Sequence, residues 1–273
     1  MFDPKSTKFP YPENTDQHYI ILKKDDGRVF DENYPYVDKS FGMKFKQFWV
    51  RVLLYLIVYP LCIPKMGLKI KGRKNLRKHK NELLNGAVTV SNHIHFWDYI
   101  AVMKALRPRH TNVIVWANNV RGENKTLIRL VGGIPIPDEN VKGKLAFNDA
   151  LKELLSHKSW LHVYSEGSMW EYYMRVRPFK KGAAYFAITS NKPLLPLAFS
   201  FRKPGWIRKH IFKQDAAITL TIGEPLFPDK SLDISKQETD LTIRSHIAVM
   251  HLAGLDEETN QYEHIFDNSK KIN

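Results

Sequence analysis

The chain has 273 residues, a formal net charge of +14 and 43% hydrophobic residues. That apolar content is ample for a core and excludes a globally disordered chain, and the length favours one domain with an N-terminal extension over two full domains. The single cysteine, Cys62, excludes a disulfide framework within the chain and is typical of a reducing compartment. The sequence does not open with the charged, apolar and small-residue pattern of a secretory signal, so we expect none.

Both ends of the chain are polar. Residues 1–44 carry four prolines, and we expect an N-terminal arm rather than a domain. One hairpin signal lies in this arm, where the apolar runs 19–22 and 29–30 flank Asp26-Gly27. Residues 256–273 predict a loose polar tail.

An apolar segment follows the arm. The twelve residues Val52–Ile63 include no charge, but a helix that spans a bilayer needs about twenty apolar residues. Pro60 and Pro64 also remove helical hydrogen bonds. We therefore expect residues 48–63 to form an interfacial or re-entrant anchor, with aromatic side chains such as Trp49 at the level of the lipid headgroups.

A basic cluster comes next. Eight basic residues and no acid lie between Lys65 and Lys80, and close to an anionic membrane each would contribute roughly 1 kcal/mol of attraction. We expect residues 45–80 to hold the protein on the cytoplasmic face of the cell membrane, as a peripheral or monotopic protein. The alternative is a buried core helix followed by a solvated basic face. We expect no nucleic-acid partner, because no DNA- or RNA-binding motif accompanies the charge.

Residues 81–255 alternate between two patterns. The predicted strands are short runs rich in β-branched residues: Ala87–Val90, Val113–Trp116, Ile134–Ile136, Leu161–Tyr164, Leu194–Phe199 and Ala217–Ile222. The predicted helices lie between or after them: Trp97–Leu106, Gly143–Leu155, Gly182–Ser190 and Lys236–Leu252. This alternation predicts an α/β domain, with a largely parallel central sheet covered by helices.

The first of these strands is followed by His93 and, five residues later, by Asp98. A carboxylate on one imidazole nitrogen sets the tautomer and leaves the other nitrogen free to accept a proton. Residues five apart in a regular helix lie about 140° apart around its axis. The two side chains can therefore meet only if His93 lies in the turn before the helix and Asp98 in its first turn. In that geometry they would form a general base with an orienting carboxylate.

Three further segments complete a pattern: Gly132-Gly133-Ile134-Pro135-Ile136, Glu166-Gly167-Ser168 and Pro193-Leu194-Leu195-Pro196-Leu197. Together with Asn92-His93-x4-Asp98, they resemble in order and separation the four sequence blocks of the glycerolipid acyltransferase family, best known for 1-acyl-glycerol-3-phosphate (lysophosphatidic acid) acyltransferases. The resemblance covers about residues 85–226. It implies transfer of a fatty acyl group from acyl-CoA or acyl carrier protein to the hydroxyl of a lysophospholipid, most readily 1-acyl-glycerol-3-phosphate. It also implies no cofactor and no metal ion.

The resemblance further implies roles for individual residues. His93 would take the acceptor's proton and Asp98 would steady the imidazolium. The oxyanion would need backbone N–H groups, around the Gly167 turn or at the start of the following helix. The expected substrate-binding residues are those of the third block and the cations that follow it: Glu166, Gly167, Ser168, Arg175, Arg177 and Lys180.

Two positions differ from the family's pattern. The arginine that usually ends the second block is Asp138 here, and the arginine of the third block is Met169. Both arginines expected near an acceptor phosphate are therefore replaced. Either the nearby cations Arg175, Arg177 and Lys180 supply the charge instead, or the acceptor carries a different headgroup.

Two other functions remain open. A metal-dependent hydrolase would use the four side chains His93, His95, Asp98 and Glu166, although no closed ligand set is evident in the sequence. A non-catalytic module that binds lipid or nucleic acid would depend on the net charge alone and would tolerate loss of His93. We favour the acyltransferase because four blocks occur in the family's order.

Overall fold

The structure is a computed structural model that describes residue 14 and residues 26–256. Its strands are β1 (Lys69–Lys71), β2 (Ala87–Ser91), β3 (Thr111–Val115), β4 (Gly133–Pro135), β5 (Trp160–Tyr164), β6 (Leu194–Arg202) and β7 (Ala217–Ile222). They form one sheet in the order β1-β7-β6-β2-β5-β3-β4. Every pairing is parallel except that of β6 with β7. The predicted α/β fold with a largely parallel sheet is confirmed.

All six predicted strands are present, with ends displaced by at most three residues. The seventh, β1, was not predicted, because a strand of three residues is too short to show an alternating pattern. It pairs with β7, so residues 69–71 belong to the sheet although the sequence assigned them to the anchor and basic cluster. The sheet therefore includes residues that precede the predicted domain start at residue 81.

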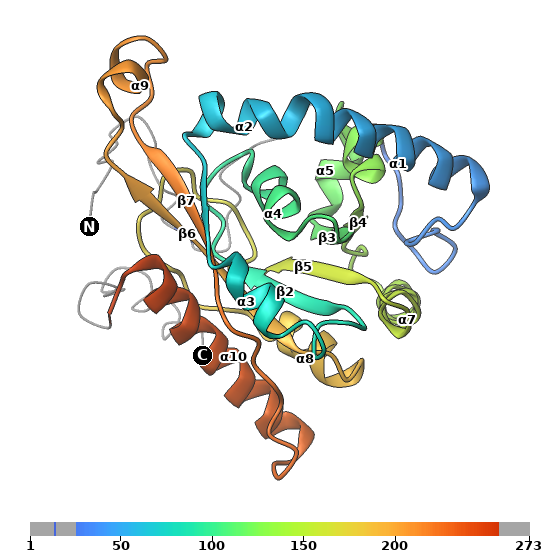
Figure 1. Ribbon diagram of the computed structural model, residues 1–273. Coiled ribbons are helices and arrows are strands. Elements are labelled where there is room, and N and C mark those ends of the chain that lie inside the picture. Colours follow the sequence, from blue (N-terminus) through green and yellow to red (C-terminus); the bar gives the residue numbers. More distant parts are fainter. Residues whose placement is uncertain (1–13, 15–25, 257–273) are drawn as a thin grey trace.

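Helices cover both faces of the sheet (Figure 1). One face carries α7 (Val141–Ser156), α8 (Gly182–Thr189) and α10 (Ile234–Ala253), and α4 (Asp98–Leu106) lies on the other. These are the four predicted helices, and α10 begins two residues early because Asp233 caps it by accepting from the backbone N of Lys236 at 3.0 Å. Four short helices were not predicted: α3 (Arg73–Lys78), α5 (Ala117–Arg121), α6 (Lys125–Leu130) and α9 (Trp206–His210).

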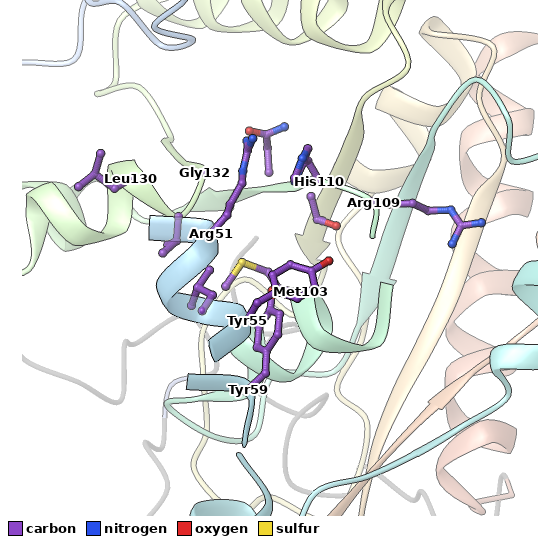
Figure 2. Close-up of a pocket in the computed structure, with 12 residues that line it drawn as sticks. Arg51, Tyr55, Tyr59, Met103, Arg109, His110, Leu130 and Gly132 are labelled. Carbon is purple, nitrogen blue, oxygen red and sulfur yellow. The ribbon is translucent and has the colours of Figure 1, made fainter. Parts of the chain in front are cut away.

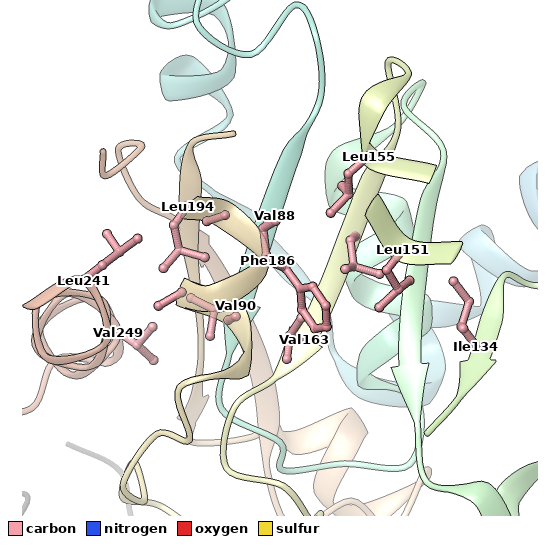
Figure 3. Packing of buried hydrophobic residues seen from close by; sticks show 14 of the residues in the cluster. Val88, Val90, Ile134, Leu151, Leu155, Val163, Phe186, Leu194, Leu241 and Val249 are labelled. Carbon is pink, nitrogen blue, oxygen red and sulfur yellow. The ribbon is translucent and has the colours of Figure 1, made fainter. Parts of the chain in front are cut away.

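The larger hydrophobic core lies between the sheet and α7, α8 and α10. Figure 3 shows Leu241 and Val249 of α10, Phe186 of α8 and Leu151 of α7 directed towards the valine and leucine side chains of the strands. A second core fills the opposite face and includes residues of α4 and of the helix before β1. The sheet is therefore buried on both sides, as expected for parallel strands with near-continuous apolar sequence.

Alternation along β2 and β5 places polar groups on the α4 side. Successive residues of a strand point to opposite faces, and Val90 and Val163 belong to the larger core. Their neighbours Ser91 and Tyr164 are paired across the two strands, as are Thr89 and His162. These four polar side chains consequently lie beneath α4, next to the carboxyl ends of both strands.

The described part of the N-terminal arm packs onto the domain. Phe30 and Tyr36 are fully buried, and Tyr36 meets the ring of Phe147 edge-on, with 5.4 Å between centroids. The guanidinium of Arg129 donates to the carbonyl oxygen of Tyr36 at 2.8 Å. The arm is thus docked into the core. Of the predicted hairpin, Asp26-Gly27 and residues 29–30 are described and form no strand, while residues 19–22 lie outside the described residues, as does the predicted tail apart from Asp256.

The apolar segment forms one continuous helix, Phe41–Met66. We expected the prolines to interrupt this helix, and they do not. It consists of α1 (Phe41–Leu53), a π-helical turn η1 (Leu54–Val58) and α2 (Tyr59–Met66). The backbone N of Tyr59 donates to the carbonyl oxygen of Leu54, five residues earlier. This wider turn comes immediately before Pro60, and local π adjustments of this kind allow a helix to continue through a proline.

This helix keeps most of its apolar surface outside the domain. By length and composition it is the one helix within residues 26–256 that could cross a membrane, and 17% of its most apolar window is buried. The exposed large side chains are Phe41, Phe45, Phe48, Trp49, Leu53, Tyr55, Leu56, Ile57, Leu61 and Ile63.

The basic cluster is not one patch beside this helix. Figure 1 shows α3 well away from α1 and α2. Two of the cations also have partners in the domain: Arg73 donates to the carbonyl oxygen of Lys104 at 2.7 Å, and Lys78 lies 2.6 Å from Glu224. The helix, and not α3, therefore provides the larger apolar surface of residues 45–80.

Candidate active site

The predicted histidine and aspartate meet at the carboxyl end of β2. His93 lies in the loop after β2, and Asp98 is the first residue of α4. The Nδ1 atom of His93 is 2.7 Å from Oδ2 of Asp98. The required turn-and-helix geometry is therefore present, at the strand ends where ligands bind in open α/β sheets.

Asp98 is held by more than the imidazole. Its Oδ2 also accepts from the backbone N of Ile94 at 3.1 Å, and its Oδ1 accepts from the Tyr164 hydroxyl at 2.7 Å. Burial opposes ionisation of this carboxyl, but the charge and hydrogen bond of His93 and the hydrogen bond of Tyr164 outweigh it and lower the pKa of Asp98. The carboxylate is thus fixed in position and ionised at neutral pH.

Tyr164 supports the pair from the neighbouring strand, although it is not among the predicted site residues. Its ring stacks on the His93 ring, with 3.8 Å between centroids and 12° between planes. Burial and the Asp98 charge raise the pKa of Tyr164 well above its usual value, so its hydroxyl remains a donor. Side chains alternate between the two faces along a strand, so the sequence of β5 could have placed Tyr164 on the α4 side of the sheet. Because Tyr164 ends β5, it would then lie near the loop after β2 that carries His93.

His162 forms an uncharged floor beneath this group. It is fully buried, 2.8 Å from the Thr89 hydroxyl at Nδ1, and its ring meets Tyr164 edge-on. Burial lowers the pKa of His162 to about 3. The residue therefore packs as a neutral hydrogen-bonding side chain and does not compete with His93 for protons near neutrality.

The Nε2 atom of His93 makes no hydrogen bond with the described part of the chain, and 23% of the side chain is exposed. Since Nδ1 faces Asp98, Nε2 is the basic position. The arrangement can accept a proton from a hydroxyl and stabilise the resulting imidazolium.

Glu166 and Arg177 form a buried ion pair beside the His93 loop. Their side chains are 1% and 2% exposed, and the atoms Oε2 and NH2 lie 3.0 Å apart. Glu166 also accepts from the backbone N of His93 at 3.1 Å and from the backbone N of Arg177 at 2.9 Å. Burial raises the pKa of Glu166, and these donors oppose that rise. The pair ties the third block to the catalytic loop.

Glu166, Ser168 and Arg177, which we predicted to bind the substrate, contact one another in the structure. The guanidinium of Arg177 donates to the hydroxyl of Ser168 at 3.0 Å and to its carbonyl oxygen, and it lies 4.4 Å from the centre of the Trp170 ring. Sequence order could not reveal this, because the partners meet only through the turn at residues 165–177. Their role in substrate binding stays a prediction.

The backbone conformation at position 167 explains why this residue is a glycine. Its φ is +83°, a backbone conformation that favours glycine. A Cβ at this position would lie 3.2 Å from Nζ of Lys180. Its N–H donates to the carbonyl oxygen of Tyr164 at 3.0 Å, so this N–H is not the oxyanion donor that the sequence suggested.

The remaining predicted cations are more accessible. Lys180 is exposed and Arg175 is half-buried. At the two positions that differ from the family's pattern, Met169 is buried and Asp138 pairs with the guanidinium of Arg121 at 2.5 Å. Arg175 and Lys180 are therefore the cations of this region that could meet an acceptor.

The four ligands of the metal-hydrolase alternative do not converge. Within residues 26–256 no group of three or more His, Cys, Asp or Glu side chains could hold a metal ion. His95 accepts from the backbone N of Trp97 at 2.9 Å through Nδ1, and both Asp98 and Glu166 are engaged as described. The donor set that this alternative requires is not assembled.

A shallow hollow lies elsewhere, under the long helix (Figure 2). Arg51 and Tyr55 of the helix and His110 line it, together with Thr111 at the amino end of β3. Figure 2 shows the Arg109 side chain directed away from Arg51. The hollow does not include His93, so it is separate from the candidate active site.

Comparison with known proteins supports a class. Residues 67–200 match the family model described as Acyltransferase, and all four sequence blocks lie within this range. The match supports the predicted resemblance to the glycerolipid acyltransferase family. The structure is also similar to the crystal structure of the 1-acyl-sn-glycerophosphate (LPA) acyltransferase PlsC from Thermotoga maritima, at 17% identity and a TM-score of 0.48, with 78% of each chain covered. No curated protein matches the chain.

Proposed function

We propose that this protein is a membrane-surface O-acyltransferase. It moves a fatty acyl group from an acyl thioester, carried by coenzyme A or acyl carrier protein, to the hydroxyl of a lysophospholipid. The observation that carries the proposal is the His93–Asp98 pair, in which Nδ1 is bound and Nε2 is open.

The reaction needs one proton acceptor and no covalent enzyme intermediate. Nε2 of His93 takes the proton of the acceptor hydroxyl as its oxygen attacks the thioester carbonyl carbon. The tetrahedral intermediate then expels the thiolate, which takes the proton from the imidazolium. Asp98 stabilises the imidazolium through Nδ1, and Tyr164 holds the carboxylate from its other oxygen.

The favoured acceptor is 1-acyl-glycerol-3-phosphate. Arg175 and Lys180 follow the third block closely and are the accessible cations near it, so they are suited to hold a phosphate. An acceptor with another headgroup is the alternative, because Met169 and the neutralised Asp138 replace two of the family's arginines.

Membrane association is supported by the position of the long helix. Its last turn lies next to the loop that carries His93, since Nζ of Lys65 is 5.9 Å from the centre of the Trp97 ring. Phe96, in the same loop, is 64% exposed. Apolar side chains thus extend from α1 to the loop that carries His93, which suits a lipid acceptor that arrives from a bilayer, on the cytoplasmic face in this proposal.

The test uses purified full-length protein with isotope-labelled acyl-CoA or acyl carrier protein and a panel of lysolipids with different headgroups. Mass spectrometry should detect a labelled diacyl product with at least one acceptor. His93→Ala serves as the matched control. The proposal fails if the wild type forms no such product, or if His93→Ala forms it at an unchanged rate.

A further inference from the structure

The hairpin between β6 and β7 carries an apolar tip. We call residues 203–215 the α9 finger, because they include the short helix α9. This segment contains none of the predicted site residues. Four large side chains on it are solvent-exposed: Trp206 (70%), Ile207 (57%), Ile211 (61%) and Phe212 (49%). They come from consecutive positions 206–207 and 211–212, so they crowd onto one short projection.

Cations surround these apolar side chains. Lys203, Lys209 and Lys213 are exposed, and none of them has an ion pair with a described residue. Asp215 is the single acid within the α9 finger. Exposed aromatic and aliphatic groups flanked by unpaired lysines match an anionic lipid surface, where the rings enter the headgroup region and the ammonium groups meet phosphates.

The α9 finger is joined to the end of the long helix. The side-chain amide of Gln214 donates to the carbonyl oxygens of Pro64 and Lys65, at 2.5 and 2.8 Å. Arg208 donates to the same Pro64 oxygen at 3.2 Å. These bonds satisfy carbonyl groups at the C-terminal end of α2, which would otherwise lack helical partners.

The contact with the end of α2 also fixes the direction in which the α9 finger projects. Figure 1 shows α9 projecting on the same side of the sheet as α1 and α2, beyond the end of α2. The exposed face of the long helix and the tip of the α9 finger therefore form one discontinuous apolar surface. A single flat partner can touch both.

We propose that the α9 finger is a second membrane-docking element, which inserts Trp206, Ile207, Ile211 and Phe212 into the same anionic bilayer that the long helix contacts. This inference rests on the membrane-surface part of the proposed function and deepens it. One helix leaves the domain free to rotate about the helix axis. A second contact beyond the end of α2 removes that freedom and holds the loop that carries His93 at the lipid surface.

The test compares three variants of the full-length protein by sedimentation with vesicles of phosphatidylcholine containing 30% phosphatidylglycerol. Trp206→Ser/Ile207→Ser/Phe212→Ser should lower the vesicle partition coefficient at least about tenfold, since each large side chain loses its apolar transfer. Lys203→Gln/Lys209→Gln/Lys213→Gln should also lower it at least about tenfold, but only on anionic vesicles. Phe227→Ser/Ile234→Ser/Ile243→Ser removes equally exposed side chains near α10 and should change binding less than about twofold.

A conservative variant tests insertion directly. Brominated acyl chains quench tryptophan emission within the bilayer, and the quenched fraction should fall in Trp206→Phe, which keeps an apolar ring. Turnover of a dispersed short-chain acceptor should be the same in the wild type and in all these variants.

The outcomes separate two failures. Equal vesicle binding by the wild type and the serine triple variant, or unchanged quenching in Trp206→Phe, overturns the role of the α9 finger and leaves the acyltransferase proposal standing. Absence of vesicle binding by the wild type overturns the membrane-surface part of the proposed function as well.

Discussion

The two halves of the candidate active site use charge in opposite ways. In the half built by β2 and α4, Asp98 pairs with His93 and leaves Nε2 open to a substrate. In the half built by the third block, Glu166 and Arg177 pair with each other and are closed off from solvent. The first half exposes the Nε2 atom of His93. In the second half, the paired charges of Glu166 and Arg177 hold the loop that carries His93.

This difference shows that the number of cations near a motif does not measure the charge available to a ligand. A buried charge is tolerated when it is paired and hydrogen-bonded, so a partner such as Glu166 keeps the Arg177 charge inside the fold. Asp138 and Arg121 neutralise each other in the same way. Under the proposed function, we expect Arg175 and Lys180 to supply the positive charge for an acceptor phosphate.

The largest effect should come from the catalytic half. His93→Ala should lower kcat/KM by about 10²–10⁴-fold, because it removes the proton acceptor, while thermal stability stays close to that of the wild type. His157→Ala, which removes an exposed histidine, should leave the rate unchanged. A rate for His93→Ala within a factor of three of the wild type would contradict the assignment of the base.

The next largest effect should be on stability, in the other half. Glu166→Gln leaves the guanidinium of Arg177 buried without its counter-ion and should lower the free energy of unfolding by about 3–5 kcal/mol in urea denaturation. Glu224→Gln, which breaks the exposed pair with Lys78, should cost less than about 1 kcal/mol. Equal losses in the two variants would show that Arg177 is not sealed from water.

Tyr164→Phe tests the support of Asp98. The variant keeps the ring stacked on His93 but removes the hydroxyl that donates to Oδ1, and we expect kcat to fall about tenfold, the scale of a hydrogen bond to a charged group. That hydrogen bond also lowers the pKa of Asp98 and so favours the charged carboxylate. Tyr185→Phe, on α8, is the matched control, and an unchanged kcat in Tyr164→Phe would rule out this positioning role.

Lys180→Gln tests the acceptor side. If a phosphate group binds there, KM for 1-acyl-glycerol-3-phosphate should rise about fivefold to tenfold with little change in kcat, since one charge-assisted contact is lost. Lys181→Gln is the adjacent control, because its ammonium group bonds Thr239 on α10 instead. A KM that is the same in both variants would favour an acceptor with a different headgroup.

The smallest effect concerns His162. Its pKa is about 3 in the folded protein against 6.5 for an ordinary histidine, so the unfolded chain binds more protons between these values and acid destabilises the fold. Between pH 6.5 and 5.5 this residue should contribute a loss of about 1 kcal/mol. In His162→Gln the pH dependence of unfolding over this interval should be shallower by that amount. If the unfolding free energy depends equally on pH in the wild type and in His162→Gln, then His162 has an ordinary pKa in the folded protein and becomes charged beneath Tyr164.

Local pattern was sufficient for much of this protein. The strands from Ala87 to Ile222 follow from short β-branched runs, and the His93–Asp98 contact follows from a spacing that crosses a single turn. Both depend on residues close together in the chain, whose geometry the backbone restricts strongly. The acyltransferase class followed from the order of four short blocks.

Tertiary structure decided the rest. Tyr164 reaches Asp98, and Arg177 pairs with Glu166, because β2, β5 and the turn after β5 come together in space. The helix continues through Pro60 because a π-helical turn precedes it. β1 becomes a strand because β7 offers it an edge. These features depend either on contacts between residues distant in the chain or on an irregular turn of the backbone. Hydrophobic periodicity in the sequence predicts neither.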